Sequence, residues 1–212
     1  MEHRFTFTDR SDGDLSVRQP GEVLDQRRSR IAPGPWTWLD QAHGDHVVVV
    51  RAPGEHTGVS ADGAVTCAPG AVLSVVAADC APLVLLAEGA IGVVHAGWRG
   101  LRAGVVDRAV EQLAAMGHRL SGAVLGPTVA AHHYEFGPSL LDEMCDLFGP
   151  SVRGATYSGA PAFDLPEAVR IVVGRHGVEL SDTGVCTACS PDHWSHRQRG
   201  DTGRHSAVAW LG

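Results

Sequence analysis

Hydrophobic positions in the middle of the chain form three short runs, at residues 72–78, 83–87 and 91–94. Each run is rich in β-branched or aliphatic residues and is bounded by Gly, Pro or acidic residues. Runs of this length with such boundaries are typical of buried strands. The pair Glu88-Gly89 separates the last two runs, which favours a strand, turn and strand unit.

Shorter patterns predict further strands on either side, at residues 4–8, 36–39, 46–52, 123–125 and 206–211, the first of them at a sheet edge. Polar or Gly-rich stretches predict a turn at 9–14, a loop at 51–58 and another turn beginning at Asp62-Gly63. Residues 18–35 are charged and without clear periodicity, so only one helical turn is expected there, at about 22–28.

The periodicity becomes helical after Gly100. Apolar side chains share one face at positions 105, 106, 109, 113 and 116, and Gly117 ends this helix. A second amphipathic helix is predicted at 138–148, stopped by Gly149-Pro150, and a third from the capping residue Asp164 to about His176. Strands and helices mix without steady βαβ alternation, which favours an α+β fold with antiparallel or mixed sheets.

Composition describes an ordinary folded protein. The chain has 212 residues, of which 44% are hydrophobic and 19% charged, and its net charge of -7 argues against nucleic acid as the main partner. Charged residues interrupt every long apolar stretch, so no membrane partner is predicted. The first 11 residues lack an apolar signal core, so the cytoplasm is the expected location. Composition predicts no oligomeric state.

The absence of lysine and the number of cysteines limit the reactions that this chain can catalyse. All 17 basic residues are Arg, and the absence of Lys excludes Schiff-base, P-loop and kinase lysines. The five cysteines are an odd number in a chain without a recognisable signal sequence, which predicts free thiols or metal ligands and not a disulfide framework.

Two reactive side chains, Cys80 and His95, stand at the ends of predicted neighbouring strands. Cys and His are both ligands of zinc, and fixed strand ends hold such ligands at the separation that a tetrahedral ion requires. His43, before the 47–50 run, is the best third ligand. Taken singly, Cys80 could be a buried core thiol and each histidine a core or loop residue without a ligand. Gly97 and Gly100 nearby permit close approach of the backbone to a ligand, which favours one site that contains all three residues.

Three blocks of the sequence resemble the signatures of the YfiH/LACC1 family, a family described as laccase-like polyphenol oxidases and as purine nucleoside phosphorylases. The blocks are Gln41-Ala42-His43-Gly44, Ala78-Asp79-Cys80-Ala81-Pro82-Leu83 and Val94-His95-Ala96-Gly97-Trp98-Arg99-Gly100. Thr8-Asp9-Arg10, Asp12-Gly13, Trp194-Ser195-His196-Arg197 and Gly200-Asp201-Thr202-Gly203-Arg204 agree as well. The resemblance implies one domain over residues 1–212, folded as an αββα layered sandwich.

The resemblance also implies a zinc-dependent purine nucleoside phosphorylase. Its substrates would be phosphate and adenosine, inosine, guanosine or S-methyl-5'-thioadenosine, and adenosine deamination would be a second activity. His43, Cys80 and His95 would be the catalytic zinc ligands, with an open fourth position. The other implied site residues are the phosphate or substrate binders Arg99, Arg10, Arg197, Arg204 and Gln41. Asp79 would orient a metal ligand, and Asp62 would orient a ligand or the substrate.

Other interpretations of the same residues stay open. With copper the site would serve a polyphenol oxidase, although such enzymes use several coppers and many His ligands. Without metal, Cys80 as nucleophile and His95 as base would make a hydrolase or amidase, acting for example on a peptidoglycan precursor. A binding module is the alternative that is not an enzyme. Metal content discriminates among the three enzyme hypotheses.

A second constellation resembles the zinc site of nucleobase deaminases, with His133-Tyr134-Glu135 and Cys186-Thr187-Ala188-Cys189 as its halves. Val185 replaces the proline of that signature and Ser190-Pro191 follows at once, so this hypothesis is disfavoured. His132-His133 stand where the family often has cysteines. A structural metal at Cys186 and Cys189 would need His193 and His196, and a solvated loop is preferred.

Overall fold

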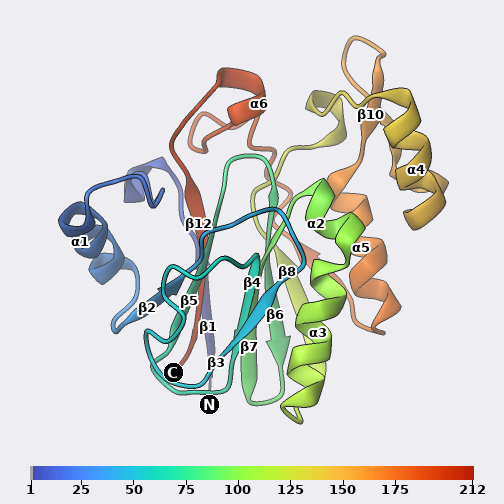
Figure 1. The fold of residues 1–212 in the computed structure, drawn as a ribbon. Helices are drawn as coiled ribbons and strands as arrows, with labels where there is room; N and C mark the ends of the chain where they lie inside the picture. Colours follow the sequence, from blue (N-terminus) through green and yellow to red (C-terminus); the bar gives the residue numbers. More distant parts are fainter. Residues whose placement is uncertain (1) are drawn as a thin grey trace.

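The computed structural model describes residues 2–212, so Met1, the first residue of the predicted domain, lies outside it. Two central sheets dominate the fold (Figure 1). The six-stranded sheet has the order β11 (Leu180–Asp182), β8 (Leu120–Leu125), β6 (Ala81–Ala87), β7 (Ala90–Ala96), β4 (Gly63–Thr66) and β3 (Val47–Val50). The four-stranded sheet has the order β1 (His3–Phe7), β12 (His205–Leu211), β5 (Val72–Ala77) and β2 (Trp36–Trp38). A small third sheet joins β9 (Arg153–Ala155) and β10 (Pro161–Phe163).

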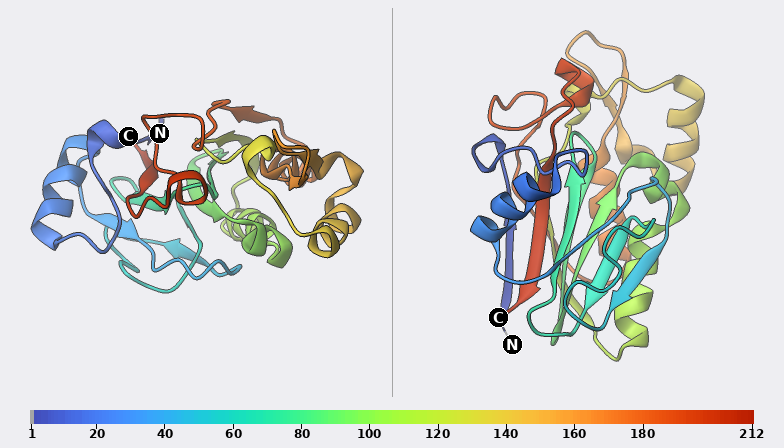
Figure 2. Two further views of the ribbon diagram at one scale, coloured as in Figure 1. Left: turned by 90° about the horizontal axis from the view of Figure 1, so that it is seen from above. Right: turned by 60° about the vertical axis from the view of Figure 1, so that its left-hand side comes forward.

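Helices cover the outer faces of both sheets, which gives four layers (Figure 2). On one side α1 (Gly21–Ile31) lies over the four-stranded sheet, where its last residue packs on a cluster that contains Trp36 and Val208. The other side carries α2 (Trp98–Ala103), α3 (Val105–Ala115), α4 (Pro138–Phe148) and α5 (Leu165–Arg175), and α6 (His196–Arg199) is a short separate turn. The predicted αββα sandwich with mixed sheets is thus confirmed.

Side-chain alternation along the strands builds two separate cores. In β6, Leu83 and Leu85 pack among the helices while Val84 packs between the sheets. In β12, Ala207 and Ala209 likewise face the inter-sheet core and Val208 faces α1. Strands that are buried on both faces need apolar side chains at consecutive positions, which is why these segments read as continuous apolar runs.

The hairpin of β6 and β7 confirms the predicted strand, turn and strand unit. Its antiparallel register pairs Pro82 with His95, so the start of β6 and the end of β7 meet at one end of the sheet. Cys80 precedes β6 directly, and it therefore reaches the same end as His95. The predicted edge strand is also confirmed, because β1 pairs only with β12 among the described residues.

Three expectations from the sequence were wrong. Residues 18–35 contain an 11-residue helix, α1, whose only buried side chain is Leu24, so it lacks the apolar face that periodicity detects. Gly63 starts the central strand β4 and no turn, because the absence of a Cβ leaves room for Val47 and the Val93 carbonyl. Helix α2 begins at Trp98, before Gly100.

The other helices follow the prediction closely. Helix α3 ends at Ala115, and Gly117 adopts a φ of 84°, in the left-handed region that favours glycine. The Asp164 side chain accepts a hydrogen bond from the Glu167 amide and caps α5 as expected. Within residues 2–212, no helix combines the length and the apolar character that crossing a bilayer requires.

His205 is a buried polar residue on β12 whose protonation opposes folding. Its Nε2 donates to the Pro127 carbonyl at 3.3 Å, whereas its Nδ1 has no partner among the described residues. Burial, and then the nearby charge of His193, lower the pKa of His205 from 6.5 to about 3. The folded protein therefore holds this imidazole neutral at pH values where the unfolded chain binds a proton.

We expect the His205 imidazole to reduce the free energy of unfolding by about 2 kcal/mol when the pH falls from about 7.5 to 5. The loss starts near pH 6.5, because there the unfolded imidazole begins to protonate, and it continues down to the folded pKa. Urea unfolding at both pH values, compared between the wild type and His205→Asn, measures this contribution. An identical pH dependence in the two proteins would contradict it.

Candidate metal centre

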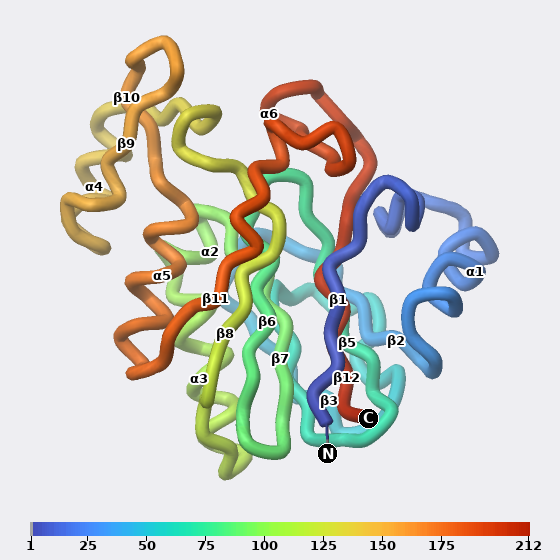
Figure 3. The backbone as a smooth tube through the Cα atoms, turned by 180° about the vertical axis from the view of Figure 1, so that it is seen from behind, coloured from blue at the N-terminus to red at the C-terminus, as the bar shows by residue number. Residues whose placement is uncertain are grey.

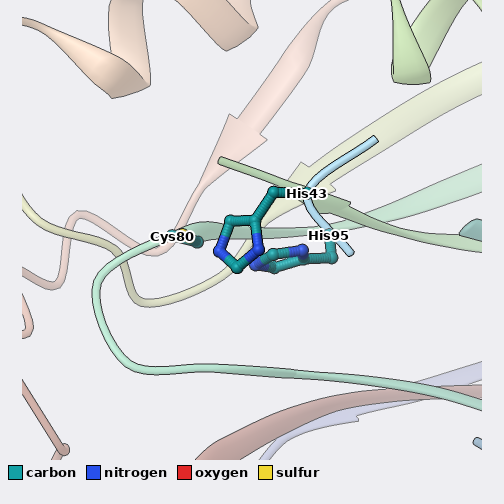
Figure 4. A group of neighbouring side chains, drawn as sticks. All are labelled: His43, Cys80 and His95. Carbon is teal, nitrogen blue, oxygen red and sulfur yellow. The ribbon is translucent and has the colours of Figure 1, made fainter. Parts of the chain in front are cut away.

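Three side chains from separate segments converge at the open end of the β6 and β7 hairpin (Figure 4). His43 comes from the loop between β2 and β3, Cys80 from the turn before β6, and His95 from β7. One ligand atom of each lies within 4.8 Å of the others, and the two imidazole centroids are 4.7 Å apart. Ligands around a tetrahedral Zn²⁺ are about 3.4–3.8 Å apart. The three ligand atoms would therefore bind such an ion after moving slightly closer to one another.

Asp62 is a buried carboxylate that orients the His95 imidazole and holds the loop of His43. Its carboxylate accepts a hydrogen bond of 2.8 Å from Nδ1 of His95, which leaves Nε2 to face the centre. It also accepts the amides of Ala42, His43 and Gly44 at 3.2, 2.9 and 2.7 Å. These three bonds hold the loop in place although His43 has a positive φ of 61°, which is uncommon for a residue other than glycine.

The electrostatics of the centre favour a thiolate beside a charged imidazole in the metal-free protein. Burial alone would raise the pKa of Cys80, but the charge of His95 and hydrogen bonds from both histidines lower it to about 6. Burial likewise opposes the charge on His95, yet the Cys80 thiolate and Asp62 raise its pKa to about 9. A metal ion would replace the proton on His95 and keep the thiolate, which is the form of cysteine that binds metals.

Gly97 makes room for this arrangement. A Cβ at this position would lie 3.0 Å from Sγ of Cys80 and 3.3 Å from Cδ2 of His43. The sequence predicts close approach of a ligand at this glycine, and in the structure its neighbours are two of the candidate metal ligands themselves.

Asp79 connects the centre to the C-terminal part of the chain. Its carboxylate accepts hydrogen bonds from the Thr187 hydroxyl at 2.7 Å and from the Arg197 amide at 2.6 Å. Its carbonyl accepts from the Thr128 hydroxyl and the Val129 amide, and its own φ is 99°. Asp79 thus holds several loops around Cys80, and its carboxylate oxygens are engaged by protein donors.

The three candidate ligands open into a cavity of about 480 Å³. Arginines from two distant parts of the chain line it, namely Arg18, Arg197 and Arg204. None of the three forms an ion pair with a carboxylate in the described part of the chain. The Arg197 guanidinium lies 5.0 Å from the ring centroid of Tyr134, a largely buried side chain whose pKa is raised by burial. The cavity therefore has three candidate metal ligands at one wall and, at another, guanidinium groups that no described carboxylate neutralises.

The structure does not bring all the predicted substrate residues to this cavity. Arg99 stacks 4.3 Å from the centroid of Trp98, and Arg10 pairs with Asp201 at 2.6 Å, and neither of them lines the cavity. Gln41 does line it, but its amide exchanges two hydrogen bonds of 2.8 Å with the Val76 backbone. Gln41 thereby pins the loop of His43 to β5.

Several residues that line the cavity were not predicted from the sequence, among them Arg18, Asp40 and Tyr134. Arg18 lies in a segment without any clear pattern, and no local signal marks it. Tyr134 directly follows His132-His133, the pair that stands where the family often has cysteines, so the resemblance offered a signal next to it. His196, considered for a structural metal, also lines the cavity.

Comparisons with known proteins cover most of the chain. A family model described as "Multi-copper polyphenol oxidoreductase laccase" matches residues 8–212. A Streptomyces coelicolor protein named purine nucleoside phosphorylase is 35% identical over 231 aligned positions, covering 98% of this chain and 95% of its own. A Mycobacterium tuberculosis protein of the same name is 37% identical over 180 positions, covering 82% and 71%.

The fold is also found among solved structures. The hypothetical protein YfiH of Bacillus licheniformis superposes with a TM-score of 0.85 at 21% identity, covering 99% of this chain and 93% of its own. The match of the family model over nearly the whole length and the 35% identity to a relative of similar length establish the relationship. The chain belongs to the YfiH laccase-domain family, whose model is described as multi-copper polyphenol oxidoreductase laccase.

Proposed function

We propose that this protein is a zinc-dependent purine nucleoside phosphorylase. Its substrates are phosphate and adenosine, inosine, guanosine or S-methyl-5'-thioadenosine, and it deaminates adenosine as a second activity. The observation that carries the proposal is the cavity that His43, Cys80 and His95 share with arginines that have no carboxylate partner among the described residues. The printed names of the Streptomyces and Mycobacterium relatives support the same reaction.

The ligand chemistry supports zinc. One thiolate and two imidazoles form a common zinc set, and three protein ligands with an open position are typical of catalytic sites. A bound Zn²⁺ supplies a Lewis acid at the wall of the cavity. Oxidation of a phenol by oxygen instead needs ions that change their redox state, and Zn²⁺ does not.

The cavity suits a nucleoside with phosphate. Its volume of about 480 Å³ is within the range of small-molecule sites. Arg197, Arg204 and Arg18 supply guanidinium groups that bind phosphate through charge-assisted hydrogen bonds. Asp79 already accepts protein donors, so Asp40 is the lining carboxylate available for the ribose hydroxyls and for positive charge that develops on the sugar.

Products formed from adenosine test this proposal. Metal-quantified protein is incubated with adenosine, with and without phosphate, and the products are separated by chromatography. Adenine and ribose 1-phosphate that form only with phosphate are expected, together with some inosine in either condition. No turnover of any of the four nucleosides by zinc-loaded protein would overturn the proposal and direct attention to phenols and to amides of peptidoglycan precursors.

The Arg197 guanidinium gives a sharper prediction. Arg197→Gln is expected to raise KM for phosphate roughly 10–100-fold, since it removes a charge-assisted hydrogen bond, while KM for the nucleoside changes little. Arg99→Gln is the matched control, because Arg99 was predicted from the sequence but lies outside the cavity. Initial rates at varied phosphate measure both. A larger effect in Arg99→Gln would contradict the assignment.

A further inference from the structure

A second group of histidine and cysteine side chains lies outside the cavity. His132 and His133 are on the short 3₁₀ helix Ala131–His133, and Cys189 is in the loop that follows β11. One ligand atom of each lies within 4.8 Å of the other two. Nε2 of His132 is 3.2 Å from Sγ of Cys189. None of the three lines the cavity, and the proposed phosphorylase reaction does not use them.

Cys186 supplies a fourth donor to this group. It stands three positions before Cys189 in the same loop, outside the group whose ligand atoms lie within 4.8 Å of one another. Its Sγ accepts the Ala130 amide at 3.4 Å. The thiolate is the form of cysteine that binds a metal. With Cys186 brought to the other three residues, the two neighbouring loops supply two imidazoles and two thiols, the Cys₂His₂ ligand set of structural zinc.

The sheet register explains how residues so far apart in sequence meet. Strands β8 and β11 are parallel neighbours, and the chain continues beyond both toward the same end of the molecule (Figure 3). The pairing extends through a bridge between Thr128 and Cys186, with amide hydrogen bonds of 3.1 and 3.0 Å from Thr128 to Val185 and from Thr187 to Thr128. Hydrogen-bonded backbone therefore presents the ligands from both sides, before any ion binds.

We propose that His132, His133, Cys186 and Cys189 form a second zinc site with a structural role. Binding of Zn²⁺ displaces the two thiol protons to solvent and leaves both imidazoles neutral, so the ion is held by two thiolates and two nitrogens. The Tyr157 ring packs against both imidazoles, with centroids 4.6 and 5.2 Å away, and shields one side of the site.

The geometry argues against the two other metal sites that the sequence suggested here, a structural site with His193 and His196 and a deaminase-like centre. His193 pairs through Nδ1 with the Ser190 hydroxyl at 2.9 Å, and His196 lines the cavity, so neither completes a metal set with Cys189. A deaminase centre would need Glu135 as proton carrier beside the metal, but Glu135 is exposed and sits in a backbone bridge to Ala162. Four protein ligands and no open position indicate a closed site.

A zinc ion here would join two loops that shape the cavity. The residue after His133 is Tyr134, which lines the cavity, and the residue after Cys186 is Thr187, which donates to Asp79. The second site is therefore expected to affect stability strongly and the chemistry only through the position of these loops.

Metal stoichiometry tests the proposal independently of the enzymatic activity. Protein is purified under a non-thiol reductant, loaded with zinc, desalted and analysed by elemental mass spectrometry. The wild type is expected to retain two zinc ions per chain, Cys189→Ala and His132→Gln one, and Cys80→Ala the other one. Cys67→Ala is the matched control, because Cys67 is an exposed free cysteine outside both groups, and it is expected to retain two.

Cobalt provides a readout for any variant that folds poorly. Co²⁺ added to Cys80→Ala is expected to give the absorption of a tetrahedral thiolate site, and this absorption is expected to disappear in Cys80→Ala combined with Cys189→Ala. A wild type that retains one zinc, lost in Cys80→Ala and kept in Cys189→Ala, would overturn the second site and leave the first intact. A Cys186–Cys189 disulfide in zinc-loaded reduced protein would overturn it as well.

Discussion

Replacing Cys80 with alanine is expected to remove zinc from the centre formed with His43 and His95 and to lower kcat/KM for phosphorolysis by at least about 10³-fold, or about 4 kcal/mol of transition-state stabilisation. The thiolate is the only anionic ligand of the three, and its loss leaves two neutral imidazoles that bind zinc far more weakly. Zinc content and initial rates with adenosine and phosphate measure the effect.

The fold is expected to survive this change. Cys80 is partly exposed and precedes β6, so its truncation leaves no large cavity in either core. Circular dichroism and thermal unfolding verify that the variant is folded, and Cys67→Ala controls for the loss of a thiol elsewhere. Full phosphorolysis by a folded Cys80→Ala protein would rule out the metal centre as the catalytic site.

Asp62→Asn is expected to have the second largest effect. The amide has the shape of the carboxylate but brings two N–H donors to a position where His95, Ala42, His43 and Gly44 already donate. An amide N–H of the introduced asparagine that faces one of these N–H groups leaves both without an acceptor in a buried position. The negative charge that stabilises protonated His95 is also lost. We expect the metal affinity to fall about 10–100-fold and the free energy of unfolding by about 3 kcal/mol.

Two measurements separate these effects. Competition with a chromogenic chelator gives the zinc affinity, and urea unfolding of metal-free protein gives the stability. Glu55→Gln is the matched control, because Glu55 also accepts two backbone amides, but at the surface and away from the centre. Unchanged zinc affinity in Asp62→Asn would show that Asp62 does not position the ligands.

The grouping of His43, Cys80 and His95 could be predicted from the sequence because each of its parts has a local signal. Cys80 and His95 follow from an apolar hairpin whose register is set by the short Glu88-Gly89 turn, and His43 lies in a short block of its own. Such features depend on residues that are near in the chain. The αββα layers followed from the family resemblance, since periodicity alone favoured only an α+β fold.

The cavity could not be predicted in the same way. Arg18 reaches it from a segment whose helix, α1, buries only Leu24, and a helix with so narrow an apolar face leaves no periodicity to detect. Arg99, in the strongest block, stacks instead on Trp98. Which arginine enters a cavity depends on how distant loops pack, and spacing along the chain carries no information about that.

The group of His132, His133 and Cys189 could not be predicted from spacing along the chain either. Spacing along the chain offered only the nearby His193 and His196 as partners for Cys186 and Cys189, and it favoured a solvated loop. The parallel register of β8 and β11 instead brings His132 and His133 to Cys189. His132 and Cys189 are 57 positions apart. Only the sheet register reveals that they are neighbours.

Metal reconstitution tests the central claim most directly. The protein is stripped with a chelator, and ribose 1-phosphate formation from adenosine and phosphate is measured after return of Zn²⁺ or Cu²⁺. We predict no product from the stripped protein and recovery with Zn²⁺. No ribose 1-phosphate with zinc, together with oxidation of a phenol after copper is returned, would contradict the account.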